Sequence, residues 1–298
     1  MPSTRREGSG IEYRVAAALS IFALASCSPL GAFDALVPKD RDGVVVVRDA
    51  AFGNNPRQRL DVYRPRTIGP TALPIIIFFY GGSWSSGSKS GYSFVGRALA
   101  SRGFLVVIPD YRLVPEVRFP AFLEDNAMAV RWVRAHGAEL GGEPRRLILA
   151  GHSAGAYNAA MLALDPRWLG SDRQWVCGLI GLAGPYDFSI SSGPVVRATF
   201  AGVSKPAMTQ PVNFVAAGDP PAFLATGEKD DVVRPANSDS LAARLSSLKI
   251  GVERRSYKGV GHAGLLTAIA RPLRGRAAVL SEMTAFARTA AQSCRPPK

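Results

Sequence analysis

The sequence of 298 residues contains few of the side chains from which metal and cofactor sites are built. It has three cysteines and three histidines, and these do not fall at the spacings typical of zinc or iron ligands. It also lacks a glycine-rich loop of the nucleotide-binding kind. The sequence therefore predicts a protein that works with neither a metal nor a cofactor.

Acidic residues are scarce beside basic ones, with 23 Asp and Glu against 36 Lys and Arg and a formal net charge of +13. The basic residues occur in short groups such as Arg145/Arg146 and Arg254/Arg255, and no basic arm or nucleic-acid-binding motif accompanies them. We interpret the charge as a solvated, arginine-rich surface, with attraction to anionic lipid headgroups as the alternative. Nucleic acid is not an expected partner.

No hydrophobic run is long enough to cross a bilayer. The apolar stretch from Val15 to Ala25 offers about 11 residues, whereas a membrane-spanning helix needs about 20. Arg5, Arg6 and Arg14 precede it. A charged segment followed by a short apolar one is typical of a secretory signal.

The end of this stretch, Leu24-Ala25-Ser26-Cys27, resembles the lipobox of bacterial lipoproteins. The resemblance implies that Cys27 is acylated and becomes the first residue of the mature protein, and a multiply acylated terminus anchors stably in a membrane. Ser28 after the cysteine implies the periplasmic face of the outer membrane. The alternative is an ordinary cleaved signal with an incidental cysteine.

The other two cysteines lie far apart in the chain. Cys177 begins an apolar run and is expected in the core, and Cys294 lies close to the C-terminus. An exported protein could join them in a disulfide. Because the sequence supplies no geometry for the pair, the redox state stays open.

Strand and helix patterns alternate after the first 42 residues. The expected strands are residues 44–48, 59–63, 74–80, 104–109, 147–150, 178–183, 222–226 and 251–257, and the expected helices are residues 92–102, 120–136, 154–164, 236–248 and 273–291. The first two strands are predicted to form a hairpin. The rest predicts a mostly parallel, doubly wound sheet with helices on both faces.

We therefore expect a signal peptide over residues 1–26, a tether over residues 27–42 and one folded domain over residues 43–298. No linker rich in Gly, Ser or Pro divides that domain. Because few residues separate Cys27 from Gly43, an N-terminal cap over the domain should be small or absent.

Gly151-His152-Ser153-Ala154-Gly155 lies where an expected strand meets an expected helix. This is the context of a Gly-x-Ser-x-Gly nucleophile elbow, in which glycines permit a crowded turn and the serine is presented above the sheet. The alternative is a serine that caps an ordinary helix. The context favours Ser153 as a nucleophile.

A serine nucleophile needs a base to take its proton. His152 lies inside the elbow and is expected to point away, and His136 precedes the serine, which is the wrong chain order for this fold. His262, in a glycine-containing loop after the last expected strand, is the predicted base. The alternative is a surface loop histidine.

The acid that orients the base should follow the preceding strand, where the chain offers Glu228, Asp230 and Asp231. An oxyanion hole should follow the strand at residues 74–80. There Gly81, Gly82 or Ser83 could donate a backbone N–H, together with that of Ala154. The sequence does not decide which of the three N–H groups points inward.

These motifs together resemble bacterial carboxylesterases related to hormone-sensitive lipase and kynurenine formamidase, over roughly Val44 to the C-terminus. The resemblance rests on the glycine loop with Trp84, Pro109–Leu113, Phe119–Asp125, the elbow, the acid loop and the histidine loop. It implies the α/β-hydrolase fold, which in this chain should have little or no cap because few residues separate Cys27 from Gly43. It also implies that Asp230 is the acid and that Asp231 occupies a variable position.

One position departs from the family's His-Gly-Gly-x-Trp motif, because Tyr80 stands where the histidine is usual. That histidine normally braces the oxyanion loop by hydrogen bonding. We expect the tyrosine hydroxyl to do so with altered geometry, which affects efficiency more than reaction class.

The resemblance implies a serine hydrolase that cleaves esters of short to medium acyl or aryl groups through an acyl-enzyme. An amidase of the arylformamidase type and a catalytically silent binding scaffold are the alternatives. A small-molecule ester and, through Cys27, a membrane are the expected partners, and oligomeric state is not indicated. Ser189–Ala217 could form a short lid through Phe200, Met208 and Phe214, or these side chains could pack locally.

Overall fold

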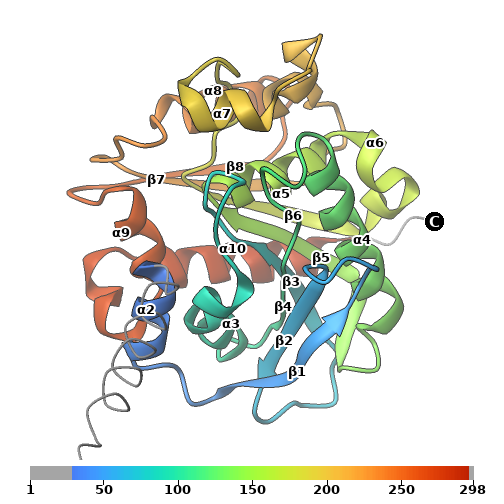
Figure 1. The fold of residues 1–298 in the computed structure, drawn as a ribbon. Helices are drawn as coiled ribbons and strands as arrows, with labels where there is room; N and C mark the ends of the chain where they lie inside the picture. Colours follow the sequence, from blue (N-terminus) through green and yellow to red (C-terminus); the bar gives the residue numbers. More distant parts are fainter. Residues whose placement is uncertain (1–28, 295–298) are drawn as a thin grey trace, which may run out of the picture.

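The computed structural model describes residues 29–294, which form one eight-stranded sheet with helices around it (Figure 1). The strands run in the order β1-β2-β4-β3-β5-β6-β7-β8. They are β1 Gly43–Ala51, β2 Arg59–Pro65, β3 Leu73–Phe79, β4 Leu105–Pro109, β5 Gly142–His152, β6 Val176–Leu182, β7 Ala222–Gly227 and β8 Val252–Tyr257. The predicted hairpin is confirmed, because β1 pairs antiparallel with β2. From β4 to β8 all pairs are parallel.

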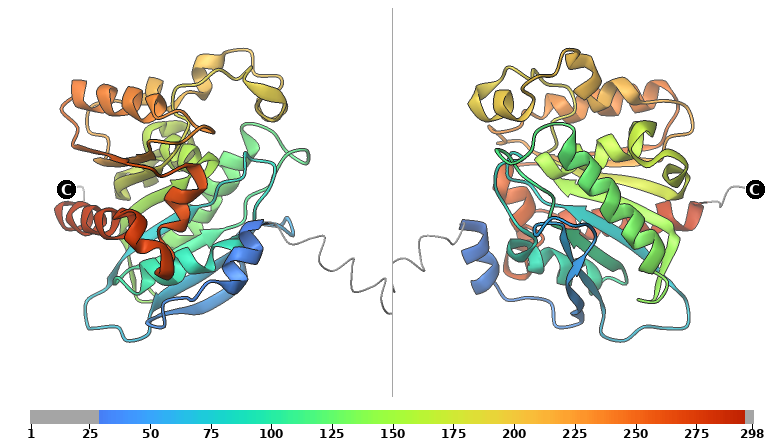
Figure 2. Two further views of the ribbon diagram at one scale, coloured as in Figure 1. Left: turned by 90° about the vertical axis from the view of Figure 1, so that its left-hand side faces the viewer. Right: turned by 45° about the vertical axis from the view of Figure 1, so that its right-hand side comes forward.

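The helices cover both faces of the sheet (Figure 2). They are α2 Pro29–Leu36, α3 Ser93–Ala100, α4 Ala121–His136, α5 Ala154–Leu164, α6 Pro166–Leu169, α7 Gly193–Thr199, α8 Ala236–Ser247, α9 His262–Thr267 and α10 Val279–Ser293. Short 3-10 turns are η1 Lys89–Tyr92, η2 Gly170–Trp175, η3 Pro206–Thr209, η4 Pro211–Phe214 and η5 Arg271–Arg276.

Strand β3 explains why the core has two layers. Its side chains alternate, so that Ile76 and Phe78 pack with α3 and α10 on one face. Ile75, Ile77 and Phe79 pack with α4, α5 and α8 on the other. A strand that is covered on both faces has a continuous run of apolar residues, and the sequence of β3 is such a run.

The segment that we expected to be a tether contains helix α2. Asp34 of this helix is buried and accepts hydrogen bonds from the Ser93 hydroxyl and the Phe94 N–H, each at 2.7 Å. These two donors lie at the start of α3, where helical N–H groups have no partner within the helix. Residues 29–36 are therefore part of the folded body.

The predicted single C-terminal helix over residues 273–291 is wrong in its first part. The structure has η5 and then α10, separated by Ala277 with extended backbone at φ −161° and ψ 143°. Gly275 just before this break has low helix propensity.

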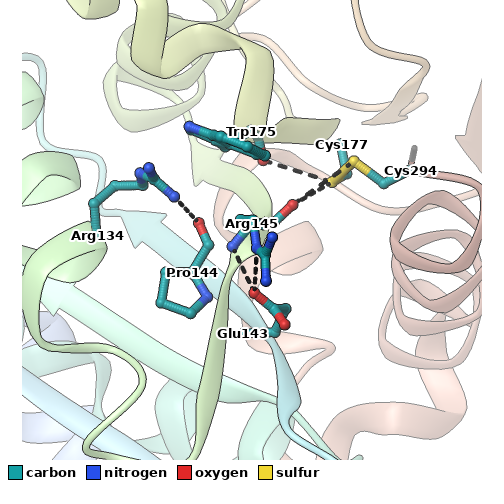
Figure 3. Close-up of a disulfide and its surroundings, with 7 residues drawn as sticks. All are labelled: Arg134, Glu143, Pro144, Arg145, Trp175, Cys177 and Cys294. Carbon is teal, nitrogen blue, oxygen red and sulfur yellow. Dashed lines mark hydrogen bonds and ion pairs between the residues drawn. A yellow bond between two sulfur atoms is a disulfide. The ribbon is translucent and has the colours of Figure 1, made fainter. Parts of the chain in front are cut away.

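A disulfide joins Cys177 of β6 to Cys294, the residue after α10, beside Arg145 of β5 (Figure 3). Their Cα atoms are 5.3 Å apart. The bridge ties the end of the last helix to the start of β6. Within residues 29–294, no helix has both the length and the apolar character that crossing a membrane requires. The predicted signal peptide and Cys27 lie outside the described residues.

Candidate active site

The nucleophile elbow has the geometry that its glycines predict. Ser153 lies between β5 and α5 with φ 54° and ψ −125°, a conformation that non-glycine residues rarely adopt. A Cβ on Gly155 would lie 2.0 Å from the Phe79 carbonyl oxygen, and one on Gly151 would lie 2.3 Å from the backbone of Gly155. Only glycine fits at either position, and the turn holds Ser153 above the end of the sheet.

His262 and Asp230 meet at the same edge of the sheet. The His262 Nδ1 and the Asp230 Oδ2 are 2.8 Å apart, as an imidazole oriented by its acid requires. Asp230 also accepts the N–H groups of Val232 and Val233 at 3.0 and 2.8 Å. Asp231 is exposed. The structure thus pairs His262 with the first of these two neighbouring aspartates.

Two opposed effects act on the pKa of Asp230. Burial raises it, but the hydrogen bonds from His262 and from the Val233 and Val232 N–H groups outweigh burial and leave the pKa below its usual value. The carboxylate is therefore ionised at neutral pH. It can stabilise the imidazolium that forms when a nucleophile is deprotonated.

The prediction that His262 lies in a loop is wrong. It is the first residue of α9, and Gly261 stands at the N-cap position. The first turn of α9 therefore fixes the backbone of His262. This placement suits a base that must return to one position in every cycle.

His152 also differs from what we expected, because its ring lies against the base. The two ring centroids are 4.7 Å apart, and the His152 Nε2 lies 3.2 Å from the His262 carbonyl oxygen. Burial and the neighbouring His262 lower the pKa of His152 to about 3. A neutral His152 can donate this hydrogen bond, so it supports the backbone of the base. His136 lies on α4 and stacks on Trp132.

The oxyanion loop follows β3. The Gly81 N–H donates to the buried Tyr92 hydroxyl at 3.1 Å, so this group is already engaged. Ser83 and Trp84 have positive φ angles of 53° and 58°, which mark a sharp turn, and Ser83 lines both pockets that Ser153 lines. Of the three predicted loop donors, this arrangement favours the N–H groups of Gly82 and Ser83, together with that of Ala154.

Tyr80 braces this loop through a partner that the sequence did not reveal. Its buried hydroxyl accepts a hydrogen bond from Arg57 Nη2 at 2.7 Å. The same guanidinium donates to the carbonyl oxygens of Gly87 and Tyr111 at 2.5 and 2.7 Å. The Tyr80 ring stacks on that of Tyr111 with centroids 4.7 Å apart, and the Tyr111 hydroxyl donates to the Tyr80 carbonyl.

Two further motif segments meet in an ion pair. Arg112 of the Pro109–Leu113 segment holds the fully buried Asp125 of the Phe119–Asp125 segment, with its Nη2 2.6 Å from Oδ1. Gln58 donates to the same carboxylate. These residues stabilise the scaffold and take no part in the site itself.

Ser153 stands between two pockets. A pocket of about 620 Å³ is lined by Ala154, Trp84 and Phe188 and also by Asp187 and Arg234. We call it the aromatic pocket. A second pocket of about 460 Å³ lies between the nucleophile, α9 and α2, and we call it the α2 pocket.

The segment Ser189–Ala217 borders the aromatic pocket, but not through the side chains that we named. Ser189, Ser192 and Val196 line the pocket. Phe200 is buried among aromatic rings, including that of Trp84 at 5.3 Å, and Met208 is exposed. Phe200 therefore packs locally, as the alternative interpretation held.

The chain is similar in sequence to known proteins. Residues 60–173 match the family model BD-FAE. Esterase LipC of Mycobacterium tuberculosis is 30% identical over 240 residues, which make up 72% of this chain and 59% of that protein. The chain thus matches about three fifths of the length of that relative.

Solved structures show the same architecture. Esterase B from Lactobacillus rhamnosis superposes with a TM-score of 0.77 at 18% identity, over 94% of this chain and 97% of that one. An esterase from the archaeon Pyrobaculum calidifontis gives a TM-score of 0.69 at 25% identity, over 94% and 93%. The chain has the α/β-hydrolase fold, and the proteins that it resembles in sequence and structure are esterases.

Proposed function

We propose that this protein is a serine carboxylesterase that hydrolyses esters of short to medium acyl or aryl groups. The observation that carries the proposal is the position of Ser153. The serine lines both pockets, and one of them also contains the ring of His262, which is hydrogen-bonded to Asp230 at 2.8 Å.

The reaction follows from this arrangement. His262 removes the proton of the Ser153 hydroxyl as its oxygen attacks the ester carbonyl, and Asp230 stabilises the imidazolium. The N–H groups of Ala154 and the oxyanion loop stabilise the negative charge on the carbonyl oxygen. The C–O bond then breaks, His262 protonates the leaving alcohol, and an acyl group remains on Ser153. Water, deprotonated by His262, releases the acid and restores the serine.

A labelling experiment tests the class of the protein. A fluorophosphonate probe should label the wild type and the Ser192→Ala variant, which removes a serine that lines the aromatic pocket. Ser153→Ala should remain unlabelled. A wild type that takes up no label would instead indicate a silent scaffold.

Substrate panels separate esterase from amidase. We expect kcat/KM for nitrophenyl esters to exceed that for formanilides. The reverse order would support an amidase of the arylformamidase type. The Ser153→Ala variant should lose both activities, because removal of a triad member costs several orders of magnitude in kcat.

We also propose that Cys27 carries lipid and anchors the protein at the periplasmic face of the outer membrane. The disulfide between Cys177 and Cys294 supports export, because such bonds persist in oxidising compartments. In its native host, the protein should partition into the detergent phase of a Triton X-114 extraction and incorporate labelled palmitate. Cys27→Ser should abolish both signals. A wild type that is soluble and free of label would contradict the anchor.

A further inference from the structure

The two pockets beside Ser153 differ in chemistry. The aromatic pocket contains the charged side chains of Asp187 and Arg234. Among the described residues that line the α2 pocket there is no Asp, Glu, Lys or Arg. Val232, which is 65% exposed, lies at the rim of both pockets. The α2 pocket therefore suits an apolar group better than a charged one.

The position of the base decides which part of an ester enters which pocket. The leaving oxygen must reach His262, because this residue protonates it as the C–O bond breaks. His262 lines the α2 pocket, together with Ala263 and Leu266 of the same helix, and does not line the aromatic pocket. The alcohol half of the ester therefore points into the α2 pocket, and the acyl half extends into the aromatic pocket.

Helix α2 forms the outer wall of this pocket. Leu30 and Phe33 line it, and both side chains are partly buried against the core. The helix is held by Asp34, which caps the start of α3. The Phe33 ring also packs edge-on against Phe94, with centroids 5.3 Å apart. The wall is thus fastened to the body of the protein, close to α9 (Figure 1).

We propose that the α2 pocket is the binding site for the leaving alcohol, and that Leu30 and Phe33 of α2 make the enzyme select esters of apolar alcohols, alkyl or aryl, that are several carbons long. This inference rests on the proposed esterase function. It assigns to α2 a role in specificity, although we expected that segment to be a tether.

The first test compares two series of esters. Acetates of methanol to hexanol vary the alcohol, and methyl esters of acetic to hexanoic acid vary the acyl group. In the wild type, kcat/KM should rise along the acetate series by up to about fourfold for each methylene that is buried, until the pocket is filled. Leu30→Trp fills the pocket and should lower kcat/KM for hexyl acetate at least tenfold relative to methyl acetate. The ratio between methyl hexanoate and methyl acetate should not change.

A matched control lies on the same helix. Leu36 is 84% exposed and does not line the α2 pocket, so Leu36→Trp should behave like the wild type in both series. Equal melting temperatures of the two variants would exclude a folding defect. If Leu30→Trp instead alters the acyl series, or if neither series changes, the assignment of the pocket is overturned.

A second readout uses the reverse reaction. An alcohol that attacks the acyl-enzyme must occupy the site of the leaving alcohol, by microscopic reversibility. With phenyl acetate as donor, Leu30→Trp should reduce the ratio of hexyl acetate to acetate formed in the presence of hexanol. The corresponding ratio with methanol should stay constant, and an equal fall in both ratios would contradict the proposal. A wild type that hydrolyses no ester would refute the proposed function, whereas active variants with unchanged ratios would refute only this inference.

Discussion

The guanidinium of Arg57 donates hydrogen bonds to the Tyr80 hydroxyl and to the carbonyl oxygens of Gly87 and Tyr111. The substitution Arg57→Met removes all three bonds. The main cost arises at Tyr80, whose buried hydroxyl loses its donor and keeps only its side-chain hydrogen bond with Asp110. Leaving a buried polar group without its partner costs about 1–3 kcal/mol. The carbonyl groups of Gly87 and Tyr111 also lose a donor. Each of these bonds contributes about 1 kcal/mol.

The ion pair with Asp110 adds little. Arg57 Nη2 lies 3.9 Å from Asp110 Oδ1, at the limit of an ion pair, and the two side chains are 28% and 14% exposed. Pairs of this kind contribute about 0–1 kcal/mol. We therefore expect Arg57→Met to lower the free energy of unfolding by about 3 kcal/mol, as measured by urea denaturation.

The same change should also affect catalysis. Because Arg57 supports both Tyr80 and Gly87, its loss should shift the loop between them, and a displacement on the order of 1 Å can cost about 10²-fold in rate. The oxyanion hole acts in the transition state, so kcat should fall by about 10- to 100-fold while KM changes little.

Matched variants isolate the effect. Arg59→Met removes the same charge two residues away and should change stability by less than about 0.5 kcal/mol. Tyr80→Phe removes the hydroxyl that loses its donor in Arg57→Met, so the loss of stability in the double variant should be smaller than the sum of the losses in the two single variants. An Arg57→Met variant with unchanged kcat, or with a rise in KM alone, would refute a role of this guanidinium in positioning the loop.

Three further predictions concern the acid Asp230, the histidine His152 beside the base, and the disulfide. Asp230→Asn should lower kcat by about 10⁴-fold because the base takes the wrong tautomer, whereas Asp231→Asn should have little effect; an exchange of these results would move the acid by one residue. Between about pH 6.5 and 3 the unfolded chain binds a proton at His152 that the folded chain does not, so stability should decrease as the pH is lowered through this range, by up to about 1.4 kcal/mol per unit. His152→Gln should reduce this slope in urea unfolding from pH 4 to 7, and identical slopes would contradict the low pKa. Cys177 and Cys294 lie 117 residues apart, so removing their bridge should cost up to about 5 kcal/mol on the chain-entropy estimate; free thiols in the oxidised protein would contradict the bridge.

The elbow could be predicted from the sequence because its information is local. Gly151 and Gly155 lie within two residues of Ser153, and their need for close backbone approach is encoded in the same five positions. The buried strands could be predicted equally well, since β3 is one continuous apolar run. In both cases neighbouring residues carry the whole signal.

The brace of the oxyanion loop could not be predicted in this way. Arg57 and Tyr80, which are hydrogen-bonded, lie 23 residues apart in the sequence, and the hydrogen-bonded pair Gly81 and Tyr92 lie 11 residues apart. Nothing near Arg57 distinguishes it from the other surface arginines of a basic chain. The only local signal was the departure at Tyr80 itself, which indicated that another partner was needed.

Helix α2 was missed for a related reason. Its eight residues carry no basic residue in the last turn and no acidic residue in the first. The helix depends on Asp34, whose partners Ser93 and Phe94 lie about 60 residues further along the chain. Tertiary contacts of this kind commonly decide the conformation of short segments with weak propensity.

Trapping of the acyl-enzyme tests the central claim most directly. The protein is mixed with a nitrophenyl ester, quenched in acid within the first turnovers, and measured as an intact protein by mass spectrometry. The account predicts a mass increase equal to one acyl group, located by peptide mapping on Ser153 and not detected in Ser153→Ala. Hydrolysis that proceeds without an acylated intermediate, or an acyl group located on a different residue, would contradict it.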